Sequence, residues 1–125
     1  MLSTQFKKGD KVVSLVIHPP EIKSGTSATI ISPYHGTLYA VKLPDGELHR
    51  WFADFELEPV NKKQKTLKFG DLAKIINTKG HPPMIKEGMI VKIAKVINNA
   101  TFYDLKLEDG KYHRWLAEFE ITYPI

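Results

Sequence analysis

Short runs of apolar residues along this chain alternate with polar residues, a spacing typical of β-strands with one buried face. Runs rich in β-branched residues at 11–17 and 72–76 predict a first strand in each half of the chain. A second strand is expected at 28–31 in the first half and at 91–94 in the second. The residues expected to point inward from these second strands are Ala28, Val91, Ile30 and Ile93.

A β-hairpin is predicted around Pro44-Asp45-Gly46 and again around Glu108-Asp109-Gly110. Proline suits the first central position of a type I turn, and glycine tolerates a left-handed residue after it. We therefore expect a three-residue loop with a glycine bulge between the third and fourth strands. A two-residue Asp-Gly turn is the alternative, and it would exchange the faces of the strands.

The segments between and after these strands have their own signals. Both halves contain His-Pro-Pro-x-Ile-Lys-x-Gly, which proline excludes from a helix interior, so we expect a long irregular loop ending at Gly25 or Gly88. After the hairpin, the three-residue segments 53–55 and 117–119 predict a single 3₁₀ turn. A short last strand is expected to follow each turn, at 56–58 and at 120–122.

The order of these elements repeats because the sequence repeats. Residues 38–57 align with residues 102–121 without a gap, and 11 of the 20 positions are identical. This self-similarity predicts two copies of one small domain. We place the first domain at 6–60 and the second at 67–125, joined by a basic linker at 61–66. A domain of this size buries only about 60% of its unfolded surface and is marginal alone.

Composition indicates an ordinary soluble globular protein, with 42% apolar and 26% charged residues. The chain has no cysteine, which excludes disulfides and thiolate chemistry. It also lacks an apolar run of membrane-spanning length and an N-terminal signal-peptide pattern, so we expect a cytoplasmic protein.

The net charge of +4 is spread unevenly. Residues 1–60 carry six Lys and Arg against seven Asp and Glu, the linker adds three lysines, and residues 67–125 carry nine against seven. A nucleic-acid-binding protein usually has a concentrated basic face. This distribution therefore favours a protein partner over nucleic acid without excluding the latter.

The predicted strand order, with a long first loop, a tight hairpin and a 3₁₀ turn before the last strand, resembles the SH3-like small barrel. Gly9-Asp10 and the glycine before the second strand are similar to KOW-type SH3 modules. The Pro-containing loop, Tyr103-x-Leu-x-Leu and the aromatic residues before the last strand resemble the YorP-like small SH3-like proteins of Bacillus prophages. The resemblance implies an all-β fold of two tandem five-stranded SH3-like barrels. It also implies a phage or prophage accessory protein that acts in the host cytoplasm on a host or virion protein.

One motif holds both arginines and both tryptophans of the chain, as His-Arg-Trp in each copy. Arg and Trp are enriched in binding hot spots, so a recognition surface is one interpretation. Its candidate binding residues, with the nearby loop and aromatic residues, are His18, Pro20, His49, Arg50, Trp51, Phe55, His81, Pro83, His113, Arg114, Trp115 and Phe119.

A structural role is the competing interpretation of the same motif, and the one to which we give more weight. Tryptophan can close one end of a small barrel, while an arginine stem covers apolar surface and its head finds a carboxylate such as Glu56 or Glu120. The His-Pro-Pro histidines would then form loop hydrogen bonds, and His49 and His113 would occupy strand surface positions. Core positions are expected at Phe52, Leu116, Leu57 and Ile121.

Metal and catalytic chemistry have little support in the sequence. Two histidines per copy without cysteine fall short of the three or four ligands that zinc needs. No phosphate-binding glycine loop or nucleophile elbow is present either. We therefore predict no enzyme activity, no cofactor and no metal.

Three functions remain open. The first is a non-catalytic protein–protein interaction module, in which two linked copies raise the effective concentration of the second binding event. The second is KOW-like nucleic-acid binding, with phosphate contacts from Lys62, Lys63, Lys65, Lys92, Lys95 and Lys106. The third is a structural or assembly protein that associates through strand edges.

Overall fold

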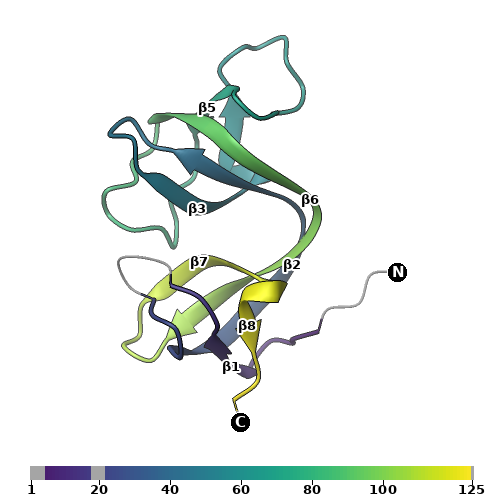
Figure 1. Cartoon of the computed structure of the whole chain (residues 1–125), viewed down its shortest axis with the longest axis vertical. Coiled ribbons are helices and arrows are strands. Elements are labelled where there is room, and N and C mark those ends of the chain that lie inside the picture. Colours follow the sequence, from purple (N-terminus) through teal and green to yellow (C-terminus); the bar gives the residue numbers. More distant parts are fainter. Residues whose placement is uncertain (1–4, 18–21, 125) are drawn as a thin grey trace. The chain divides into compact units, whose positions relative to one another are not determined.

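The computed structural model describes residues 5–17 and 22–124, and it confirms the predicted all-β class (Figure 1). None of the described segments forms a helix long and apolar enough to cross a membrane. The sheet has the order β4-β5-β6-β2-β1-β8, with β3 paired to β2 and β7 paired to β6, and every strand pair with a described register is antiparallel. The elements are β1 (Lys11–Ser14), β2 (Ser27–Lys42), β3 (Leu48–Ala53), η1 (Asp54–Glu56), β4 (Leu57–Pro59), β5 (Leu72–Ile75), β6 (Ile90–Leu107), β7 (Tyr112–Ala117), η2 (Glu118–Glu120) and β8 (Ile121–Thr122).

The second and third strands predicted in each repeat form one long strand. β2 has 16 residues and β6 has 18. Neither strand is interrupted where its apolar residues give way to Ser32-Pro33 in β2 or to Asn98-Asn99 in β6. β2 and β6 are neighbours in the sheet, and this pairing satisfies backbone groups that an isolated extended segment would leave to water. The predicted separation of these strands was therefore wrong.

The chain forms two compact units, and each unit takes parts of both repeats. Unit 1 combines the residues up to His35 with those from Ala100 onward, whereas unit 2 is Gly36–Asn99. In Figure 1, β2 and β6 each continue from one unit into the other. The compact units thus differ from the domains expected at 6–60 and 67–125, and the segment 61–66 lies inside unit 2 as the connection between β4 and β5.

The two hydrophobic cores show the same exchange in their side chains. Each core combines the front part of one repeat with the hairpin and last strand of the other. The core of unit 1 contains Phe6, Val12, Ile22, Ala28, Ile30, Tyr103, Leu105, Leu107, Leu116 and Ile121. The core of unit 2 contains Tyr39, Val41, Leu43, Phe52, Leu57, Leu67, Ala73, Ile75, Ile85, Val91 and Ile93. The inward positions predicted for the second and last strands are confirmed.

Strand pairs between the repeats close each unit. In unit 1, β1 pairs with β8 and places Val13 opposite Thr122. In unit 2, β5 pairs with β4 and places Ile75 opposite Leu57. These ladders leave neither unit complete without both repeats.

The local predictions for turns are largely confirmed. In the first hairpin, Leu43 N donates to Glu47 O at 2.8 Å and Gly46 N donates to Leu43 O at 2.9 Å, as expected for a three-residue loop. Gly46 has a φ of 92°, which is the left-handed position predicted for the glycine bulge. The 3₁₀ turns start one residue later than expected, at Asp54 and Glu118.

The exchange of strands makes a prediction for a single repeat. The fragment 67–125 contains β5 to β8 but no partner repeat, so the two ends of β6 belong to different, incomplete units. We expect this fragment to form a dimer in which two copies exchange β5 and β8 as the repeats do in the full chain. Sedimentation equilibrium with circular dichroism tests this, using fragment 36–99 as the control that should fold as a monomer. A folded monomer of 67–125 would show that β6 bends readily.

Candidate functional site

The two His-Arg-Trp motifs lie on β3 and β7 at matched irregularities of the ladder. The register with the partner strand shifts between Tyr39 and Ala40 in one hairpin and between Tyr103 and Asp104 in the other. Such a bulge lets two successive side chains turn to the same side of a strand. Consistent with this, Trp51 and the next residue Phe52 are both at most 1% exposed.

Both tryptophans are part of the protein interior. Trp51 is 1% exposed and Trp115 is 0% exposed. The Trp115 ring packs edge-on against Phe102 and Tyr34, with centroid distances of 5.0 and 4.8 Å. A partner could reach neither indole without unfolding the hairpin, so the burial of these residues favours the structural interpretation of the motif.

Two buried glutamates hold the 3₁₀ turns that follow the motif. Glu56 Oε1 accepts a hydrogen bond from Ala53 N at 2.8 Å, and Glu120 Oε1 accepts the matching bond from Ala117 N at 2.8 Å. Both glutamates are at most 1% exposed. These carboxylates therefore fix the chain direction after each hairpin, and the carboxylate that the structure places against Arg114 is Asp104, where the sequence suggested Glu56 or Glu120.

The arginines of the two motifs differ in their surroundings. Arg114 is 8% exposed, and its Nε donates to Asp104 Oδ2 at 3.1 Å. Its guanidinium carbon lies 4.7 Å from the centroid of the Trp115 ring. Arg50 is exposed, and the residue opposite it on β2 is Ala40, where the other hairpin has Asp104. Only Arg50 therefore presents its charge to solvent.

The histidines are more buried than expected. His81 Nε2 lies 2.9 Å from Glu56 Oε2, and neither side chain is exposed. The His81 ring also stacks on Phe52 at a centroid distance of 4.4 Å. His49 and His113 are 9% and 3% exposed, so their predicted surface position was wrong. His18 and Pro20 lie outside the described residues.

The accessible members of the predicted site are few. Phe55 and Phe119, at the centres of the two 3₁₀ turns, are 44% and 64% exposed. Arg50 and Pro83 are exposed as well. The structure thus leaves these four as surface residues and places the other described members in or next to the cores. Within residues 5–17 and 22–124, no three His, Cys, Asp or Glu side chains are placed to hold a metal ion.

A pair of matched tyrosines lies beside carboxylates. Burial raises the pKa of Tyr39, and the nearby charge of Asp54 raises it further. Burial also raises the pKa of Tyr103, whose hydroxyl donates to Glu118 Oε1 at 2.7 Å. Both phenols therefore stay protonated at neutral pH, and Tyr103 also accepts a bond from Phe6 N at 3.3 Å. This network ties the N-terminal segment into unit 1.

The predicted lysines are all exposed and mostly lie in one unit. Lys106 belongs to unit 1, and the other five belong to unit 2. Unit 2 carries eleven Lys and Arg against seven Asp and Glu, a net of +4, whereas unit 1 carries seven of each. The whole net charge of the chain is therefore on unit 2.

Exposed apolar residues accompany this charge, and the sequence reasoning missed them. Phe69, which follows Lys68 in the sequence, is 77% exposed, and Leu72, which lies opposite Lys92, is 51% exposed. The internal repeat holds a signal for Phe69, because the matching position of the first copy is Lys8. An aromatic residue that replaces lysine on an exposed turn indicates a surface specific to one copy.

Comparisons with known proteins found similar folds among solved structures. No family model matches the chain, and no curated protein matches it. A crystal structure of ydhK from Bacillus subtilis, described as a DUF1541 family protein, superposes with a TM-score of 0.72 at 22% identity over 98% of this chain and 86% of that one. The chain shares its fold with ydhK.

Two further structures of ydhK agree. A second crystal structure has a TM-score of 0.66 at 22% identity and covers 93% of this chain and 98% of that one. The solution structure of the ydhK C-terminal domain has a TM-score of 0.68 at 24% identity, with coverages of 94% and 93%. At these identities the likeness to ydhK concerns the fold alone, and the resemblance to SH3-like prophage proteins stays a prediction.

Because both tryptophans are buried, we predict that each contributes substantially to the free energy of unfolding. Replacing Trp51 or Trp115 by alanine should lower the free energy of unfolding by about 3–5 kcal/mol, because a large buried side chain is lost. Thermal and urea unfolding of each variant measure this, with exposed Phe119→Ala as the control that should change little. A Trp115→Ala variant as stable as the parent would contradict the core position.

The Asp104–Arg114 pair predicts a difference between the hairpins. Asp104→Ala copies the residue found at position 40, but it leaves the buried guanidinium of Arg114 without its carboxylate, which costs about 3–5 kcal/mol. The double variant Asp104→Ala with Arg114→Met should recover most of that loss, whereas Arg50→Met should be nearly neutral. Urea unfolding of the parent, Asp104→Ala, Arg114→Met and the double variant tests the coupling, and additive effects of the two substitutions would refute it.

Proposed function

We propose that each unit is a small SH3-like barrel and that the chain is a non-catalytic binding protein. Within the described residues, each unit contains five strand segments and one 3₁₀ turn directly after its hairpin, which supports the barrel proposal. In this proposal the barrels are assembled across the two repeats instead of following one another along the chain. Origin in a phage or prophage rests on the resemblance alone and stays a prediction.

Three buried carboxylates next to the repeated motif support a non-catalytic role. Glu56 and Glu120 bind the backbone of their own turns, and Asp104 binds Arg114. Each group is buried and engaged in holding the fold, so none is presented to a substrate. We therefore infer that the repeated His-Arg-Trp motif has a structural role.

A protein partner is the ligand that we infer, from the exposed surface of β5 and β6. Leu72 lies directly opposite Lys92, and Lys74 lies directly opposite Ile90. All four side chains are exposed, so apolar and cationic groups alternate on one face of the strand pair. A partner that covers this face needs apolar side chains together with carboxylates, which a protein surface supplies.

Nucleic acid is the second candidate. The observation that favours it is the concentration of the predicted phosphate-binding lysines in unit 2, where they add to a net charge of +4. The exposed aliphatic residues of β5 and β6 disfavour nucleic-acid binding, because they offer no stacking surface for bases. A structural or assembly role through strand edges is the third.

Affinity capture with matched charge variants tests the proposal. The immobilised chain is exposed to a lysate of the native cell with and without nuclease, beside Lys74→Glu/Lys92→Glu in unit 2. The control is Lys23→Glu/Lys111→Glu, which makes the same charge change at exposed positions of unit 1. We expect a protein that is retained after nuclease treatment, is lost with the unit 2 variant and is kept by the control.

Two results would overturn the protein-binding proposal. If all captured protein disappears with nuclease and oligonucleotides bind directly with a steep salt dependence, the chain binds nucleic acid. If capture is equal for the unit 2 variant and the control, the β5–β6 face is not the binding surface.

A further inference from the structure

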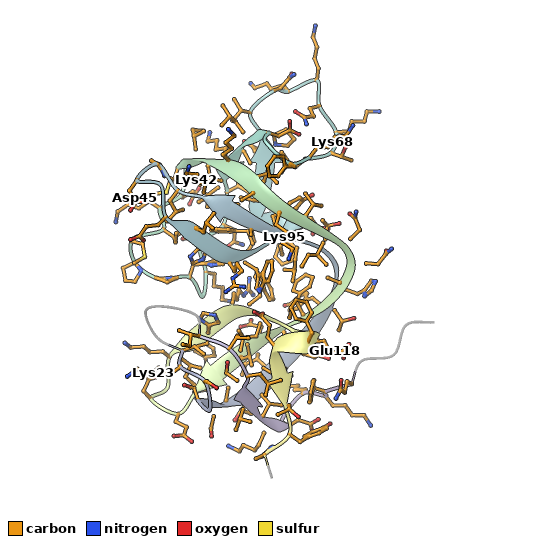
Figure 2. All side chains as sticks on the ribbon, in the orientation of Figure 1. Lys23, Lys42, Asp45, Lys68, Lys95 and Glu118 are labelled. Atoms are coloured by element: carbon orange, nitrogen blue, oxygen red, sulfur yellow. The ribbon has the colours of Figure 1, made fainter. Side chains whose placement is uncertain are left out.

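A hollow in unit 2 is lined by the turn before β5 and by the middle of β6. Its volume is about 650 Å³, within the range of ligand-binding pockets. The wall residues are Thr66, Leu67, Lys68, Phe69, Ala94, Lys95, Val96 and Asn98. Figure 2 labels Lys68 and Lys95, one from each of the two chain segments that line the hollow. The lining therefore combines the apolar residues Leu67, Phe69, Ala94 and Val96 with two lysines.

The backbone that carries Phe69 is fixed on both sides. Lys68 N donates to Asp71 Oδ2 at 2.7 Å, and Asp71 N donates to Lys68 O at 3.0 Å. Gly70 N then donates to Ile93 O at 2.8 Å, which ties the turn to β6. A ring that is 77% exposed on such a fixed turn can bind without a cost for ordering the loop.

The matching turn of unit 1 has the same geometry and a different side chain. Lys7 N donates to Asp10 Oδ2 at 2.9 Å, and Gly9 N donates to Ile30 O at 2.8 Å. The residue at the tip is Lys8, so the fold does not require an aromatic ring at this place. The exposure of Phe69 thus has no structural reason within the turn.

The charges around the hollow define its ligand. Lys68 and Lys95 lie in its wall, and Lys65 lines an adjacent hollow that shares Thr66 and Leu67. The carboxylate of Asp71 is already engaged by Gln64 and by Lys68 N. The site therefore needs a ligand with an apolar group in the centre and negative charges around it.

We propose that this hollow binds an extended acidic segment of a partner protein, with one bulky apolar side chain placed against Phe69 and carboxylates at the flanking lysines. This inference rests on the proposed protein-binding function and specifies its partner. A peptide fits better than single-stranded nucleic acid because Phe69 is the one aromatic residue in the lining of the hollow, whereas nucleic-acid sites stack successive bases on aromatic side chains.

Fluorescence anisotropy with a labelled synthetic peptide tests this assignment on the full chain. The probe is an extended peptide of about ten residues, long enough to span roughly 33 Å, with a central leucine flanked by glutamates. Replacing this leucine by serine should weaken binding about tenfold, since burial of one apolar side chain is lost. An oligothymidylate of similar charge is measured in parallel.

The protein variants use the repeat as a guide. Phe69→Lys introduces the residue that unit 1 carries at the matching position, so it should fold, and it should weaken the leucine-centred peptide about tenfold. Leu48→Lys is the control, because Leu48 is 70% exposed in the same unit and lies outside the hollow. Lys95→Glu should weaken the peptide as well, whereas Lys42→Glu should not. Phe69→Ser repeats the test without added charge, and circular dichroism checks each fold.

The outcomes separate this inference from the proposed function. Loss of peptide binding in Phe69→Lys and Phe69→Ser, but not in Leu48→Lys, supports the hollow. Equal binding by all variants overturns it, even where a captured protein still depends on Lys74 and Lys92. Tighter binding of oligothymidylate than of the peptide, unchanged or strengthened by Phe69→Lys, also overturns it and favours nucleic acid.

Discussion

The exchange of strands between the repeats is the constraint on which the rest of the structure depends. β1 pairs with β2 of its own repeat on one side and with β8 of the other repeat on the other side, and β4 pairs with β5 across the repeats. Each hydrophobic core is therefore closed by residues that are far apart in the sequence. A unit of this size has little surface to bury, so losing either ladder would remove a large share of its stability. Because pairings of high sequence separation form late and slowly, the N-terminal strand must wait for the end of the chain before unit 1 is complete.

This constraint also explains why the His-Arg-Trp motif is repeated. Both hairpins must supply half of a core to a unit whose other half comes from the opposite repeat. Trp51 and Trp115 occupy the same ladder irregularity, and Glu56 and Glu120 hold the same turn behind it. Because both hairpins must pack in the same way, both keep the same residues, and no ligand is needed to explain the repetition. The repeated motif is therefore explained by the shared scaffold.

Features that depend on local residues could be predicted from the sequence. Features that depend on which segment a strand pairs with could not. Proline and glycine at residues 44–46 predict the hairpin loop correctly, because the turn geometry is set by those residues alone. The repeat predicts two units and their core residues, since both copies share one alternation. The continuity of β2 through Ser32-Pro33 could not be predicted, because it depends on pairing with β6.

The candidate site follows the same division. Sequence enrichment of Arg and Trp drew attention to Trp51 and Trp115, yet burial depends on a ladder irregularity that composition does not reveal. The pairing of Arg114 with Asp104 was assigned to the wrong carboxylate, because the cross-strand register decides which acid lies opposite. Phe69 was visible only as a mismatch with Lys8, and its meaning needs the exposure that the structure gives.

The net charge is distributed differently when it is counted by compact unit than when it is counted by repeat, because strands are exchanged between the repeats. Counted by repeat, the basic residues are diluted between an acidic first half, a linker and a mildly basic second half. Counted by unit, the linker lysines join those of β5 and β6, and unit 2 has all of the net charge while unit 1 is neutral. The two units, each assembled from both repeats, thus differ in charge more than the repeats do. The same turn carries Lys8 in unit 1 and the exposed Phe69 in unit 2, and under our proposal this difference assigns recognition to unit 2.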